Sequence, residues 1–186
     1  MPMPPPPEDL SGLSLAEIAR LADEKRLPPV ERWNPTHCGD SAMRIARDGT
    51  WFHEGSPIGR PAMVRLFSTI LRREPDGGFV LVTPVEKLDI QVEDAPFLAL
   101  ELRSEGEGEQ RSLAFRLNTG DLVVAGPQHP LRFEAGPHPY LEVRAGLDAL
   151  VARPVYYELA EIALAEGAEP PGVWSNGVFF PLEQSA

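Results

Sequence analysis

The chain has 186 residues, of which 42% are hydrophobic, and it carries a formal net charge of −11 with a pI near 4.8. This length allows one large domain or two small ones with a real core. The acidic balance argues against a general nucleic-acid binder or a protein held on an anionic membrane surface, because both need clustered basic residues. The single cysteine, Cys38, excludes an internal disulfide framework. With no signal-peptide or membrane-span pattern, the sequence predicts a cytoplasmic protein.

The positive charge is concentrated in one stretch of this acidic chain. Between Arg44 and Arg73 there are six arginines and two acidic residues, so 6 − 2 gives a local charge of +4. Arginine suits the bidentate capture of phosphate or carboxylate better than lysine does. The alternative is that these arginines form the solvated face of an amphipathic helix.

Residues 1–35 are predicted to form a proline-rich tail and a short helical arm. Ser14 and Glu17 make a capping box at the start of the arm. Apolar residues then recur at helical spacing as far as Lys25, at Leu15, Ile18, Ala19, Leu21 and Ala22.

Residues 36–95 are predicted to form a first α+β domain. Asp48-Gly49 lies between two strand-like runs and is a strong hairpin signal, because such a turn needs positive φ. Arg60-Pro61 opens a helix with proline at its first position, and the sequence predicts that this helix ends at Asp76-Gly77-Gly78. Its apolar stripe contains Met63, Val64, Phe67, Ile70 and Leu71.

Residues 96–186 are predicted to form a second domain, a curled antiparallel sheet or partial barrel capped by a helix. Short strands separated by turn residues are typical of such a sheet. Arg153-Pro154 opens the helix, and residues 177–182 close the domain as a strand. The expected strands before the helix are 97–102, 113–117, 122–125, 131–133 and 141–143.

An internal repeat connects the two domains. Each Arg-Pro helix start is followed by a leucine six residues after its arginine, at Leu66 (66 − 60 = 6) and at Leu159 (159 − 153 = 6). Upstream of the helices, residues 45–49 resemble residues 143–146, and downstream residues 78–86 resemble residues 177–183. We therefore predict a duplicated α+β unit, with chance similarity between two generic hairpin-plus-helix units as the alternative.

Several runs resemble the bacterial domain-of-unknown-function family 1285. In the first half these runs are Cys38–Asp40, Met43–Phe52, Ser56–Arg60, Leu81–Lys87 and Val92–Phe97. A looser match in the second half involves Tyr140–Arg144, Arg153–Leu159 and Gly172–Trp174. The resemblance implies two related α+β domains, the second loosely like pleckstrin-homology barrels. It also implies a small-ligand site between the domains for a nucleotide-like compound, and a role in signal transduction.

The residues themselves suggest an anion site at a helix start. Free backbone N–H groups beside Arg60 would attract a phosphate or carboxylate, with Arg153 as the equivalent at the second helix. The alternative is that both arginines are structural and clamp a carboxylate such as Glu86 or Glu183. The predicted ligand-binding residues are Arg47, His53, Arg60, Thr83, Glu86, Lys87 and Arg153.

No catalytic signature, metal-ligand spacing or cofactor motif is recognised in the sequence. The first hypothesis is therefore a non-enzymatic module that binds a small anionic ligand and signals to a protein partner. Two other hypotheses stay open. One is a small enzyme in the same cleft with His53 or Glu86 as general base, and the other is a protein-interaction module with an exposed apolar patch.

Overall fold

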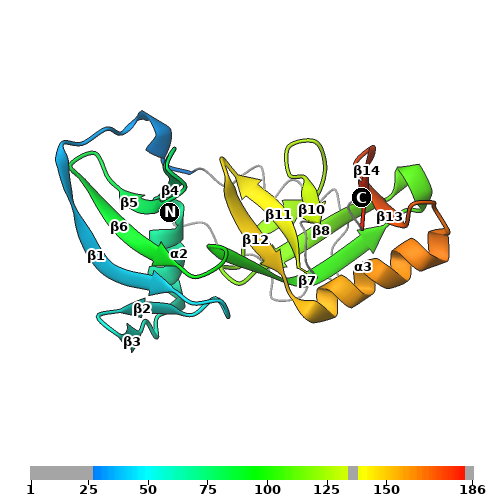
Figure 1. Cartoon of the computed structure of the whole chain (residues 1–186), viewed down its shortest axis with the longest axis horizontal. Helices are drawn as coiled ribbons and strands as arrows, with labels where there is room; N and C mark the ends of the chain where they lie inside the picture. The colour runs from blue at the N-terminus through cyan, green and yellow to red at the C-terminus, as the bar shows by residue number, and fades with distance from the viewer. Residues whose placement is uncertain (1–26, 134–137, 183–186) are drawn as a thin grey trace.

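The computed structural model describes residues 27–133 and 138–182. The predicted helical arm therefore lies outside the described residues. Figure 1 shows two sheet-rich domains side by side along the long axis of the molecule, each with one α-helix. Within the described ranges, no helix is long and apolar enough to cross a membrane.

The first domain is built on a six-stranded sheet in the order β3-β2-β1-β6-β5-β4. Its neighbouring strands are antiparallel except β1 and β6, which run parallel. A short 3-10 helix, η1 (Val30–Arg32), precedes the sheet. The other elements are β1 (His37–Ile45), β2 (Trp51–His53), β3 (Ser56–Pro57), α2 (Pro61–Thr69), β4 (Leu71–Arg73), β5 (Phe79–Val82) and β6 (Glu86–Val92).

The predicted hairpin is confirmed as the pair β1–β2. Met43 pairs with His53 and Ile45 with Trp51 across it. Gly49 in the turn has a φ of 85°. A Cβ atom at this position would come within 2.9 Å of both the Asn118 and the Leu98 side chains. The turn therefore requires glycine both for its backbone and for its close approach to the second domain.

The first helix is shorter than the sequence predicted. It starts at Pro61 as expected but ends at Thr69, and residues 71–73 form β4. Leu71 is fully buried opposite Leu81 of β5. This residue, which the sequence placed on the apolar stripe of the helix, therefore belongs to the sheet. Asp76-Gly77-Gly78 turns the β4–β5 hairpin instead of ending a helix. Arg72 and Arg73 consequently lie on a strand.

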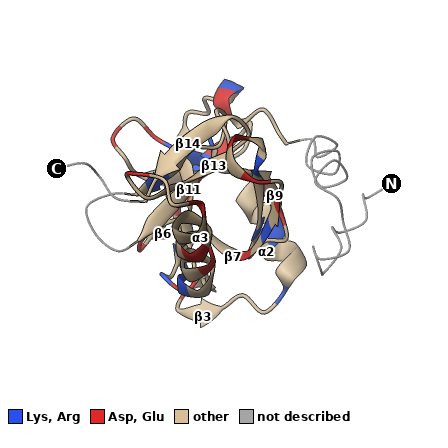
Figure 2. Ribbon diagram, turned by 90° about the vertical axis from the view of Figure 1, so that its right-hand side faces the viewer, with Lys and Arg blue, Asp and Glu red and all other residues tan. Residues whose placement is uncertain are grey.

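The second domain contains a six-stranded sheet in the order β10-β11-β12-β7-β8-β9. Register shifts between Ala99 and Glu101 and between Glu142 and Arg144 bend its strands. The sheet curls toward a half-barrel, and Figure 2 shows acidic residues along α3 beside it. Its elements are β7 (Phe97–Glu105), η2 (Gly108–Gln110), β8 (Ser112–Leu117), β9 (Leu122–Val124), β10 (Leu131–Phe133), β11 (Pro139–Arg144), β12 (Leu147–Val151), α3 (Arg153–Glu166), β13 (Gly172–Ser175) and β14 (Val178–Pro181).

The order of elements supports a duplicated architecture at a coarse level. An antiparallel hairpin is followed by a helix and a second hairpin in both domains, through β1–β2, α2 and β4–β5 and then through β11–β12, α3 and β13–β14. The copies differ in the pairing of the second hairpin, and the extra strand β3 follows the first hairpin only in the first domain. The β4–β5 hairpin extends the first sheet, whereas β13–β14 forms a separate two-stranded sheet.

The two domains share one continuous apolar core. Ile45, Trp51 and Leu71 of the first domain belong to the same buried cluster as Phe97 and Leu147 of the second. Trp51 also stacks on Phe67 of α2, with ring centroids 6.4 Å apart. This shared core fixes the relative position of the elements that meet at the domain junction.

Candidate functional site

A cavity of about 460 Å³ lies at the junction of the two domains. Its first wall is the N-terminal segment, defined here as residues 27–34, which contributes Val30, Glu31, Trp33 and Asn34. The second wall is residues 71–75, from β4 onward. The third is the β11–β12 turn with Arg144, Ala145 and Leu147. Ligand-binding cavities commonly have volumes of roughly 300–1,000 Å³, so this cavity has a suitable size.

Three arginines line this cavity, which we call the arginine cavity, and the first has a structural role. Arg72 donates to the carbonyl oxygens of Val30 and Trp33 at 2.8 and 2.7 Å, and it pairs with Glu74 at 2.9 Å. Lys87 also pairs with Glu74, at 3.3 Å. The hydrogen bond from Arg72, assisted by Lys87, lowers the pKa of Glu74 despite its partial burial. Arg72 thus ties the N-terminal segment to β4.

The other two arginines come from different domains and keep donors available. Arg73 donates to the Gly146 carbonyl oxygen at 3.2 Å, and Arg144 donates to the Ser68 carbonyl oxygen at 2.6 Å. Neither forms an ion pair with a carboxylate among the residues that the structure describes. Each guanidinium has five N–H donors, so most of them stay available to a ligand.

Aromatic rings hold both guanidinium groups in place. The Arg73 Cζ atom lies 5.4 Å from the centroid of the Phe79 ring, and the Arg144 Cζ atom lies 5.4 Å from that of Phe97. Burial lowers the pKa of Arg144, and the negative charge of Glu31 on the N-terminal segment opposes this shift. A partly desolvated cation gains more from an anionic partner than a fully hydrated one does.

One wall of the arginine cavity offers an aromatic surface as well. Trp33 is half-buried and lines the cavity beside Asn34. An indole at such a position can stack on a planar ligand group, while an amide can exchange hydrogen bonds with it. The cavity therefore combines two guanidinium groups with the indole ring of Trp33 and the side-chain amide of Asn34.

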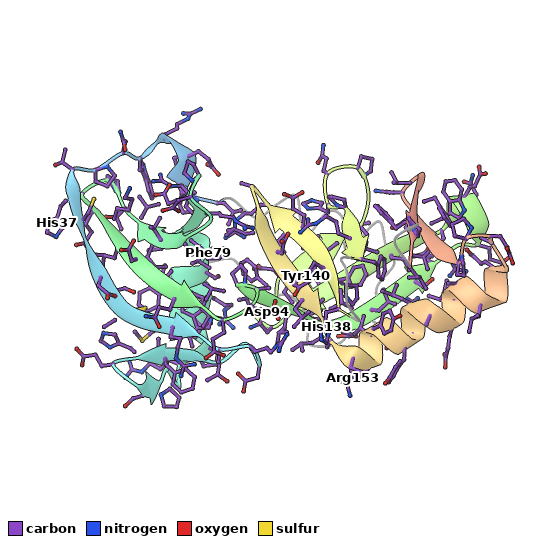
Figure 3. The ribbon with its side chains drawn as sticks, viewed as in Figure 1. His37, Phe79, Asp94, His138, Tyr140 and Arg153 are labelled. Carbon is purple, nitrogen blue, oxygen red and sulfur yellow. The ribbon has the colours of Figure 1, made fainter. Side chains whose placement is uncertain are left out.

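Arg60 and Arg153 are exposed residues at the starts of different helices. Figure 3 labels Arg153 at the start of α3, and neither residue lines the arginine cavity. Neither pairs with a carboxylate within residues 27–133 and 138–182, and Glu183 lies outside those ranges. The neighbours of Arg60, Gly59 and Pro61, border a second junction cavity of about 320 Å³, which is also lined by Asp48 and several apolar residues.

Arg47 takes part in the contact between the domains. Its side chain pairs with Asp94 at 3.0 Å, and its backbone N–H donates to Glu93 at 2.9 Å. Tyr140 of β11 donates its hydroxyl hydrogen to the other oxygen of Asp94, at 2.6 Å. Figure 3 shows Asp94 and Tyr140 near the junction. We call Arg47, Asp94 and Tyr140 the junction triad.

The remaining predicted residues lie at two places in the first domain. Thr83, Glu86 and Lys87 come together around the β5–β6 turn, where Thr83 Oγ1 accepts from the backbone N–H groups of Val85 and Glu86 at 3.3 and 3.2 Å. These two hydrogen bonds satisfy backbone N–H groups of the turn, so the Thr83 hydroxyl has a structural role. Lys87 approaches the arginine cavity through its pair with Glu74. His53 is exposed at the end of β2. Across the described part of the chain, no three His, Cys, Asp or Glu side chains form a group that could hold a metal ion.

Sequence reasoning did not include Arg73 and Arg144 among the site residues, although two signals pointed to them. Arg73 belongs to the basic stretch, but the predicted helix placed it on a solvated face. Arg144 lies in the turn region that the internal repeat aligns with Arg47. Only the tertiary structure shows that β4 and the β11–β12 turn meet at one cavity.

Comparisons with known proteins cover nearly all of the described chain. Residues 28–95 match the N-terminal domain of DUF1285, a domain of unknown function, and residues 96–182 match its C-terminal domain. A crystal structure of a DUF1285 family protein from Silicibacter pomeroyi DSS-3 is 48% identical, with a TM-score of 0.78, over 92% of this chain and 96% of that one. Another, from Shewanella baltica OS155, is 29% identical, with a TM-score of 0.53, over 65% of this chain and 91% of that one. No curated protein matches significantly. The chain therefore belongs to the DUF1285 family.

Proposed function

We propose that the protein is a binding module for a small anionic ligand held between its two domains. The observation that carries this proposal is the pair Arg73 and Arg144. These guanidinium groups come from different domains, line one cavity of suitable size and have no carboxylate partner among the described residues. Two forks on one cavity suit a phosphate or carboxylate, because each can donate two parallel N–H bonds.

A nucleotide-like ligand fits the rest of the lining. Its phosphate would bind between Arg73 and Arg144, and its planar base would stack on Trp33. Asn34 would exchange hydrogen bonds with the edge of the base. A ligand of this kind uses all three walls of the arginine cavity.

Ligand binding at this place provides a route to signalling. The ligand would contact β4 in the first domain and the β11–β12 turn in the second, so it would stabilise one arrangement of the junction. In this proposal the second domain, with its curled sheet loosely like a pleckstrin-homology barrel, presents the changed surface to a protein partner. The partner and the cytoplasmic location are part of the proposal.

A thermal-shift screen against inorganic phosphate, pyrophosphate, nucleotides, cyclic nucleotides and carboxylates tests the proposal. A ligand at about 100 times its Kd adds ~2.7 kcal/mol of stability. Arg73→Gln and Arg144→Gln should each reduce the shift, while Arg65→Gln, on the exposed surface of α2, is the matched control. No shift from any compound with folded protein would contradict the proposal. A shift that Arg60→Ala removes and Arg144→Gln leaves intact would move the site to the start of α2.

A further inference from the structure

Glu31 is an unpaired acidic residue in the lining of the arginine cavity. It lies in η1 on the first wall, whereas Arg144 lies on the third wall. The negative charge of Glu31 acts on Arg144 and opposes the fall in pKa that burial causes there. Within residues 27–133 and 138–182, however, the Glu31 carboxylate forms no ion pair with Arg144 or with any other cation. The two charges therefore line the same cavity without neutralising each other.

The backbone that carries Glu31 is fixed on both sides. Val30, the residue before it, is 5% exposed and packs on apolar side chains of β5. Arg72 donates hydrogen bonds to the carbonyl oxygens of Val30 and Trp33, which lie on either side of Glu31 in the chain. The backbone N–H of Trp33 also donates to the Val30 carbonyl oxygen, at 3.3 Å. A ligand that contacts Glu31 therefore does not have to order the segment that carries it.

An unpaired carboxylate beside arginines suits a ligand that has a hydrogen-bond donor next to its anionic group. An ionised carboxylate has no hydrogen to donate, so the ligand must supply the donor. The charge of Glu31 reaches Arg144, where the phosphate of the proposed ligand binds, and Trp33, on which its base stacks, follows Glu31 in the same short segment. The sugar of a nucleotide joins its phosphate to its base. Its hydroxyl groups are donors of the kind that the Glu31 carboxylate needs.

We propose that Glu31 determines ligand specificity by accepting hydrogen bonds from sugar hydroxyl groups, so that the arginine cavity selects ribonucleotides over their deoxy analogues. This role rests on the proposed function of the cavity. A site built to bond a hydroxyl group rejects an analogue that lacks it, because a polar group of the site is then left without its partner. The same carboxylate weakens the binding of an anion that has no hydroxyl donor, because its negative charge opposes that of the anion. Glu31 therefore has opposite effects on a ribonucleotide and on pyrophosphate.

Isothermal titration of the full chain with ADP, 2′,3′-dideoxy-ADP and pyrophosphate tests this role, and GDP with its dideoxy analogue repeats the comparison for a second base. At least one ribonucleotide should bind about 10-fold more tightly than its dideoxy analogue, as expected for one hydrogen bond to a charged group. Glu31→Ala should abolish this preference. Glu31→Gln, which removes only the charge, should raise the affinity for pyrophosphate by about 2–5-fold. Glu109 is the matched control, because it is exposed at the corresponding position of η2 and does not line the cavity. Glu109→Ala and Glu109→Gln should change none of these affinities.

The possible failures of this role and of the anion site can be told apart. Equal binding of both ribonucleotides and their dideoxy analogues, or binding of pyrophosphate alone, would overturn the role of Glu31 and leave the anion site standing. A preference for the ribonucleotide that persists in Glu31→Ala would show that another group contacts the hydroxyls. A loss of both nucleotide and pyrophosphate affinity in Glu31→Ala would mean that Glu31 only supports the cavity wall. If the wild-type protein binds none of these compounds, the proposed anion site fails and the role of Glu31 fails with it.

Discussion

Arg144 is the residue on which the proposed ligand site most depends. It lies on the second domain, donates to Ser68 of α2 in the first and lines the arginine cavity beside Arg73. Among the residues described, no carboxylate pairs with it, although the charge of Glu31 acts on it. In this position the guanidinium group can connect the two domains and also donate hydrogen bonds to a bound anion.

The Arg144→Lys substitution tests whether ligand binding needs the planar guanidinium group or only its positive charge. Lysine keeps the positive charge but loses the planar pair of donors, so we expect pyrophosphate affinity to fall by roughly 10–100-fold, as for the loss of one charge-assisted hydrogen bond. Isothermal titration measures this change directly. Arg65→Lys is the control and should bind as the wild type does. Equal affinity of Arg144→Lys and wild type would show that the fork is not used.

The ionisation of Glu74 should make the stability of the fold depend on pH. Its pKa is lowered in the folded state, chiefly by the hydrogen bond from Arg72 and further by Lys87. A carboxyl with a lowered folded pKa contributes stability that is present above its unfolded pKa and lost as pH falls through the folded value. Glu74→Gln should therefore cost about 1–2 kcal/mol in the free energy of unfolding at pH 7. The difference should shrink as pH falls below 4.5, the ordinary value.

Urea unfolding of both proteins at several pH values measures this difference. Glu107→Gln, at an exposed position near η2, serves as the control and should leave stability unchanged at every pH. A destabilisation by Glu74→Gln that is constant down to pH 3 would show that the charge of Glu74 is not what stabilises the fold.

At the scale of elements, the β1–β2 hairpin brings the first domain against the second. Gly49→Ala adds a Cβ at a φ of 85° and within 2.9 Å of the Asn118 and Leu98 side chains. We expect a loss of more than ~1 kcal/mol in the free energy of unfolding, because both the backbone and the contact are strained. Gly77→Ala separates these causes, since its φ is 89° but no atom lies within 4 Å of the added Cβ. A similar loss at both positions would mean that the interdomain contact contributes nothing.

Local turn and helix-start signals predicted their elements well, and tertiary pairing decided the rest. Asp48-Gly49 and the two Arg-Pro helix starts were found because their chemistry is contained within a few residues. Residues 71–73 were assigned to a helix because Leu71 continues its apolar stripe, yet pairing with Phe79–Leu81 makes them a strand. The strand β12 (Leu147–Val151) was missed, and its parallel partner β7 begins fifty residues earlier, at Phe97. The arginine cavity depends on the same long-range pairings.

At the scale of the whole molecule, the two domains behave as one unit because they share a core. The junction triad adds a polar connection, in which Asp94 accepts from both Arg47 and Tyr140. We expect a single cooperative unfolding transition for the full chain. Two separated transitions in calorimetry would contradict a shared core.

Removal of the Tyr140 hydroxyl measures how much the junction triad contributes to the free energy of unfolding. Tyr140→Phe leaves Asp94 without one of its donors, so we expect a loss of about 1–2 kcal/mol in the free energy of unfolding. Tyr157→Phe, at a position that is 57% exposed on α3, is the matched control and should change little. If both variants unfold at the same urea concentration as the wild type, the triad does not stabilise the junction.

The most direct test of the central claim is an NMR titration of the full chain with inorganic pyrophosphate, observing the Nε–Hε signals of the arginine side chains. We predict that the signals of Arg73 and Arg144 shift in a saturable way with one shared Kd, while that of Arg65 stays in place. Equal shifts at all exposed arginines, including Arg60 and Arg153, or no saturable shift at all, would contradict an anion site between the domains.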